Sequence, residues 1–63
     1  MFTFEKMTGE NCWLACFPNG LTPAQSQIVR RYGGHGSASN KGYIFLLDDI
    51  ADVNRLYQEL RDA

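Results

Sequence analysis

Two unbroken runs of apolar residues, Cys12–Phe17 and Tyr43–Leu47, constrain the fold of this chain more than any other feature. Short runs that are rich in aromatic and branched residues are typical of strands with apolar side chains on both faces. Residues 2–7 instead alternate between apolar and polar side chains, which predicts a half-buried strand. Residues 8–11 supply turn chemistry, so we expect the first two strands to form a hairpin.

Two helices are expected between and after these strands. Residues 22–25, Thr-Pro-Ala-Gln, provide a capping threonine, a proline suited to the first helical position and a glutamine for a capping box. This helix is expected to end near Tyr32, because two glycines follow. The second helix is expected to begin after Asp48 or Asp49, and its apolar residues recur at helical spacing: Ile50, Val53, Leu56, Tyr57 and Leu60.

The resulting order is β-β-α-β-α, which predicts an α+β fold. The economical arrangement is a two-layer sandwich, with a three-stranded mixed sheet carrying both helices on one face. The second and third strands would then be parallel and joined through the first helix by a right-handed crossover. We expect a single domain over residues 1–63. One apolar side of each central strand would stay uncovered, and such a patch indicates an interface.

Cys12 and Cys16 do not predict a disulfide. On a strand their Cα atoms would lie roughly 13 Å apart, whereas a disulfide requires less than about 7 Å. We therefore expect reduced thiols and a cytoplasmic protein. Two thiols and one distant histidine also fall short of a zinc site, so neither metal nor cofactor is expected. The sequence has no transmembrane run and no signal-peptide pattern, so no membrane contact is expected.

Residues 30–43 concentrate the cationic and glycine-rich character of the chain. They include two arginines, a lysine, the only histidine, two tyrosines and four of the six glycines. The longer segment 11–47 holds no Asp or Glu and carries a formal charge of +3, while the rest of the chain carries −4. The net charge of −1 therefore hides a dipolar layout, which indicates a surface for an anionic partner.

No catalytic set can be assembled from the sequence. No serine, cysteine or acidic residue has a position that ties it to His35, so no catalytic residue is expected. The glycine-rich loop that follows leads into a strand rather than a helix, and it lacks the Gly-x-x-x-x-Gly-Lys-Ser/Thr pattern of a phosphate loop. We therefore expect a small non-enzymatic module that acts by binding.

The expected binding surface combines aromatic anchors with a cationic rim. Aromatic residues and arginine dominate interface hot spots, and cations steer an acidic partner toward the surface. Trp13 is also suited to the centre of the core, so both interpretations stay open for it. The partner is expected to be a host or replication protein, or a second copy of the chain in a homodimer. The candidate partner-binding residues are Trp13, Arg30, Arg31, His35, Lys41 and Tyr43.

Single-stranded nucleic-acid binding by the same residues is the alternative function. The cations would neutralise phosphates, and the aromatic side chains would stack on bases, as they do on other sheet platforms. The chain is acidic overall, however, whereas nucleic-acid modules are usually basic. Three cations would give a weak contact that is sensitive to salt.

From Leu21 to about residue 60, the chain resembles a short module of phage and plasmid proteins of DNA metabolism. In that module a helix ends in Gly-Gly, a polar loop leads to a lysine-glycine-aromatic strand, and an amphipathic helix follows. The module commonly has a basic residue and a tryptophan after Gly-Gly, where His35 and Gly36 stand here. The resemblance implies a compact α/β accessory module, encoded by a phage or mobile element, and brings no catalytic residues. The matching segments are 32–34, 40–45 and 53–60.

Overall fold

The structure is a computed structural model of the chain, and it describes residues 2–9, 11–37 and 42–63. Each strand and helix expected from the sequence is present within one or two residues, and one further short strand occurs. The fold is α+β, with two helices and a four-stranded sheet. In chain order the elements are β1 (Thr3–Lys6), β2 (Cys12–Cys16), α1 (Pro23–Arg31), β3 (His35–Ser37), β4 (Gly42–Leu46) and α2 (Ile50–Asp62).

The prediction of a three-stranded mixed sheet is wrong in two respects. The sheet has four strands in the order β1-β2-β4-β3, and each neighbouring pair is antiparallel. The additional strand β3, expected to be loop, pairs with β4 and reverses the direction of the chain before β4 begins. As a result β4 runs antiparallel to β2, and α1 connects β2 to β3, which runs in the same direction as β2 but is not its neighbour.

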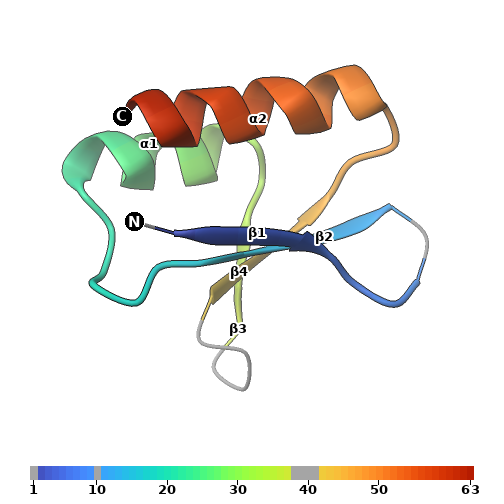
Figure 1. The fold of residues 1–63 in the computed structure, drawn as a ribbon, viewed down its shortest axis with the longest axis horizontal. Coiled ribbons are helices and arrows are strands. Elements are labelled where there is room, and N and C mark those ends of the chain that lie inside the picture. Colours follow the sequence, from blue (N-terminus) through green and yellow to red (C-terminus); the bar gives the residue numbers. More distant parts are fainter. Residues whose placement is uncertain (1, 10, 38–41) are drawn as a thin grey trace.

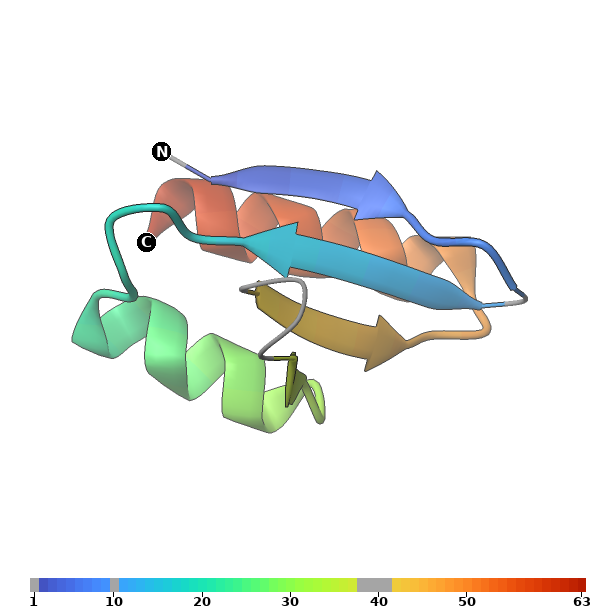
Figure 2. The same ribbon diagram turned by 90° about the horizontal axis from the view of Figure 1, so that it is seen from below.

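The molecule has two layers, with both helices on one side of the sheet. Figure 1 shows α1 and α2 above the sheet, while Figure 2 shows the strands from below, with α2 behind them. The hairpin of β1 and β2 is confirmed, with Phe4 opposite Ala15 in its register. Neither helix in the described part of the chain is long and apolar enough to cross a membrane.

The hydrophobic core lies between the helices and the sheet. Its buried residues come from β2, α1, β4, α2 and the segment after β2, and partly buried aromatic side chains extend it toward β1. Phe2 stacks on Phe17 at a ring-centroid distance of 5.6 Å, and Phe4 stacks on Trp13 at 5.8 Å. The buried core residues are Ala15, Phe17, Ile28, Val29, Phe45, Leu56 and Leu60.

The capping signals at the start of α1 are confirmed. The backbone N–H of Gln25 donates to the hydroxyl of Thr22 at 3.1 Å, and the N–H of Thr22 donates to the Gln25 side chain at 3.0 Å. Gly33 has φ +72°, the left-handed conformation that glycine adopts readily after a helix end. Gly34 is required for packing instead, since a Cβ there would lie 2.7 Å from Val29 Cγ1.

Helix α2 is capped by Asp49, whose side chain accepts from the N–H of Ala51 at 2.9 Å. Three of its five predicted core positions are buried. Ile50 and Tyr57 are the exceptions, because they are 62% and 41% exposed. Ile50 stands at the first helical position, outside the sheet layer, whereas Tyr57 contacts the rings of Phe2 and Phe4 at the side of the core.

Candidate functional site

The two central strands carry apolar side chains on both faces of the sheet. Trp13 and Ala15 of β2, like Tyr43 and Phe45 of β4, pack on the core under the helices. Because side chains alternate along a strand, the residues between them point to the opposite side, which we call the open face. The open-face residues are Thr3, Glu5, Cys12, Leu14, Cys16, His35, Ser37, Gly42, Ile44 and Leu46.

The register of the strands arranges these residues in rows across the sheet. Leu14 lies opposite Ile44 in the central row, and Cys12 lies opposite Leu46 in the next. The central row extends to both edge strands, because Glu5 pairs with Leu14 and His35 pairs with Ile44. The open face is therefore apolar in its middle, with a carboxylate at one edge and an imidazole at the other.

Exposure on the open face increases toward the end of β4. Leu14, at the centre, is only 7% exposed, and Ile44 beside it is half-buried. Leu46 is 63% exposed, the highest value among the large hydrophobic residues of the described part of the chain. A leucine in a strand that is otherwise well packed is costly to leave in water, at about 25 cal/mol for each Å² of apolar surface. Leu46 and its neighbours thus form the patch that most needs a cover.

Gly42 keeps β2 and β4 close at the other end of the open face. A Cβ on Gly42 would lie 2.4 Å from the carbonyl oxygen of Ala15 and 3.0 Å from the Sγ of Cys16. Only glycine fits this contact without displacing the backbone of β2. The lysine-glycine-aromatic pattern of the sequence thus has a structural reason at its glycine.

The predicted aromatic anchors do not lie on the open face. Trp13 and Tyr43 point to the helix side of the sheet, where both contact the core. The indole of Trp13 stacks on Phe4, and its Nε1 is buried with no hydrogen-bond acceptor among the described residues. The sequence leaves two interpretations of Trp13 open, and this position agrees with the one in which Trp13 belongs to the core.

The predicted cationic residues are spread over separate surfaces. Arg30 and Arg31 are exposed at the end of α1, and Arg31 forms an ion pair with Glu59 of α2. His35 is exposed on edge strand β3, on the open face. Lys41 lies outside the described residues. Within the described chain, therefore, only His35 of the six candidates belongs to the open face.

Glu59 joins the two helices through two side chains of α1. Besides its ion pair with Arg31, it accepts a hydrogen bond from the hydroxyl of Tyr32. This hydrogen bond, together with burial, raises the pKa of Tyr32 above its ordinary value of about 10. The guanidinium of Arg31 also lies over the Tyr32 ring, 5.6 Å from its centroid. These contacts engage Arg31 within the fold, which reduces its freedom to meet a partner.

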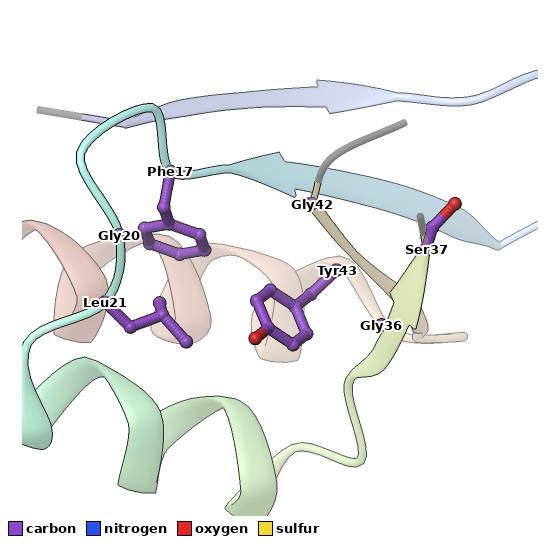
Figure 3. Close-up of a pocket in the computed structure, with 7 residues that line it drawn as sticks. All are labelled: Phe17, Gly20, Leu21, Gly36, Ser37, Gly42 and Tyr43. Atoms are coloured by element: carbon purple, nitrogen blue, oxygen red, sulfur yellow. The ribbon is translucent and has the colours of Figure 1, made fainter. Parts of the chain in front are cut away.

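An open groove of about 640 Å³ lies between the segment that precedes α1 and the strands β3 and β4. Figure 3 shows Phe17, Leu21 and Tyr43 directed toward the groove, whereas Ser37 points away. Glycines 20, 36 and 42 complete its wall. The lining has no charged side chain, and no three His, Cys, Asp or Glu residues of segments 2–9, 11–37 and 42–63 are grouped so that they could hold a metal ion. The lining of the groove is thus mainly aromatic, aliphatic and glycine.

The alternation of the central strands limits the open-face residues to one of two alternate sets. In Cys12–Phe17 and Tyr43–Leu47, either alternate set was able to face the helices, and the sequence does not choose between them. The aromatic and smaller residues at positions 13, 15, 43 and 45 face the helices, which leaves the aliphatic set outside. The aromatic signal for an interface hot spot therefore marks the core in this chain.

Comparison with known proteins gives no further information about the site. No protein-family model, no curated protein and no solved structure matches the chain.

Proposed function

We propose that this chain is a small non-enzymatic protein-binding module, and that the open face is its contact surface. It would act stoichiometrically, as an accessory protein of a phage or mobile element that binds and modulates a host or replication protein. Its location would be the cytoplasm, where the thiols of Cys12 and Cys16 would stay reduced.

The observation that supports this proposal is the apolar middle of the open face. Leu14, Ile44 and Leu46 lie side by side on the two central strands, opposite the side that both helices cover. A sheet in a small domain is stabilised when both faces are covered. An apolar patch on a rigid sheet, exposed here at Leu46, is also suited to binding, because little ordering entropy is lost when a partner covers it.

The orientation of the aromatic side chains favours a protein partner over a nucleic acid. Proteins that bind single strands stack bases on exposed aromatic rings beside cations. Here Trp13 and Tyr43 point toward the helices, and Arg31 is paired with Glu59. The open face offers aliphatic side chains, which match an apolar protein surface better than they match a charged nucleic-acid strand.

Photo-crosslinking from the open face tests this function. A photoreactive amino acid at position 46 should form a discrete adduct with a protein in cells that make the chain. Position 50 provides a matched control, because Ile50 is exposed as much as Leu46 (62% against 63%) but lies on α2. Adducts from position 46 and none from position 50 would support the proposal, whereas equal yields or no adduct would contradict it.

A titration with single-stranded DNA and RNA separates the alternative function. Electrostatic binding is strongest at low salt, so fluorescence anisotropy at low ionic strength is the most sensitive condition. The protein-binding proposal expects no saturable binding there. Saturable binding that Arg30→Glu weakens and Leu46→Lys leaves unchanged would favour the nucleic-acid function.

A further inference from the structure

The central row of the open face has complementary ends. It runs Glu5, Leu14, Ile44, His35 across the four strands, from edge strand β1 to edge strand β3. Both terminal residues are exposed. A carboxylate accepts hydrogen bonds, and an imidazole donates them, so one end of the row is chemically suited to bind the other end of an identical row.

Symmetry converts this complementarity into a specific mode of association. Consider two sheets facing each other about a two-fold axis that runs parallel to the strands, between β2 and β4. The rotation reverses the strand order, so β1 of each copy lies over β3 of the other. Glu5 then faces the partner's His35, and the partner's Glu5 faces His35. A two-fold interface of this kind uses the same patch on both copies.

We propose that a second copy of the chain covers the open face in this arrangement. This proposal rests on the function proposed above, because it takes the open face to be a protein-binding surface. It identifies the partner as a second copy of the chain.

The apolar rows are matched in the same arrangement. Leu14 faces the partner's Ile44, so two branched residues from each copy fill the centre. In the neighbouring row Cys12, a small and partly buried side chain, faces the partner's Leu46. The exposed leucine therefore lies over the smaller residue, as interdigitating layers about 10 Å apart require.

A two-fold axis perpendicular to the strands gives a different contact. It places each strand over the same strand of the partner, so Glu5 would approach the partner's Glu5. Like charges placed opposite each other are unfavourable. This arrangement would also bring Cys12 near the partner's Cys16, so a disulfide between copies would reveal it. The parallel axis avoids the repulsion and keeps these thiols apart.

The size of the face sets the strength expected of the dimer. The patch is four strands wide, at about 4.8 Å per strand, and about five residues long, at about 3.3 Å per residue, which gives a flat area of roughly 300 Å² on each copy. A standard interface buries about 800 Å² on each partner. The dimer should therefore be weak, with a dissociation constant in the micromolar range or above, and it should form as the concentration is raised.

Sedimentation velocity with charge-swap variants tests the proposal. From about 10 µM to about 1 mM, where a weak interface dissociates and forms, the mass should rise from 7.1 kDa toward twice that value. Glu5→Lys should weaken the dimer about tenfold or more because it removes the carboxylate that faces His35, and His35→Glu should do so because it places two carboxylates together. The double variant should recover to within about threefold of the original, since the pair is restored in reverse.

Leu46→Lys and Ile50→Lys provide the matched apolar controls. Leu46→Lys should abolish the dimer, while Ile50→Lys should leave it unchanged, and circular dichroism should show both variants folded because both positions are exposed. A monomer throughout the range would overturn the proposal, as would a dimer that is insensitive to the charge swaps or that forms the Cys12–Cys16 disulfide between copies.

The failure of this proposal differs from the failure of the proposed function. A monomeric chain that still forms adducts with another protein from position 46 leaves the protein-binding function standing and removes the second copy as partner. A monomeric chain without adducts contradicts both. Adducts whose mass corresponds to two copies of the chain support both.

Discussion

Leu14 and Ile44 lie opposite each other on β2 and β4, on the side of the sheet that neither helix covers. They are the centre of a row that ends in Glu5 on one edge strand and His35 on the other. The pair connects the fold to its proposed use, since the same register that packs Phe45 and Ala15 under the helices directs these aliphatic side chains outward.

Gly42 is expected to be the most sensitive glycine of the sheet. In Gly42→Ala the new Cβ would lie 2.4 Å from the carbonyl oxygen of Ala15, which should reduce the free energy of unfolding by about 1–3 kcal/mol. Gly36→Ala is the control, because its Cβ would meet Tyr43 at an ordinary 3.8 Å, with a change within about 0.5 kcal/mol. Urea unfolding measures both, and equal losses would contradict the close approach of β2 and β4.

The hydrogen bond between Tyr32 and Glu59 should be visible in a pH titration. Glu59 raises the pKa of Tyr32 in the folded protein. The contribution of this hydrogen bond to stability is therefore complete below pH about 10, which is the pKa of tyrosine in the unfolded chain. It is lost as the pH rises through the higher folded value. In Glu59→Gln, tyrosinate absorbance should show one tyrosine that ionises at lower pH, and stability should fall less steeply in alkali. An unchanged titration would contradict this contact.

Trp13 should matter for stability rather than for partner binding. Trp13→Phe keeps a ring that can stack on Phe4 and removes an indole N–H that has no acceptor in the described structure. We expect a loss of stability below about 1.5 kcal/mol and a binding free energy unchanged within about 0.5 kcal/mol. At an interface hot spot, truncation to alanine would instead cost about 2 kcal/mol or more of binding free energy. Measuring the binding of Trp13→Ala beside that of Leu46→Ala would reveal such a loss.

The sequence predicted the elements better than their arrangement. The helix ends followed from local chemistry, such as the capping box of Thr22 and Gln25 and the left-handed Gly33. Strand β3 was missed because His-Gly-Ser carries no apolar alternation, and its hydrogen bonds depend on β4 rather than on its own side chains. Without β3 the chain reversal was invisible, so β4 was expected to run parallel to β2.

The sequence predicted an uncovered apolar side of the sheet but did not identify the residues that form it. Two apolar strands and only two helices predicted that one apolar side of the sheet would stay uncovered. Which side it would be depends on how the rings of Trp13, Tyr43 and Phe45 fit under the helices. This is a property of three-dimensional packing, and alternation along a single strand leaves it open.

The thiol of Cys12 offers the most direct test of whether the open face is covered by protein. Cys12 is half-buried and lies opposite Leu46, so a partner on this face would block access to it. Alkylation followed by mass spectrometry should show Cys12 reacting at least about tenfold more slowly in cells than in dilute purified protein, as expected when most copies are bound. In Leu46→Lys the two rates should be equal. Equal rates for the original chain would contradict the central claim that the open face is an interface.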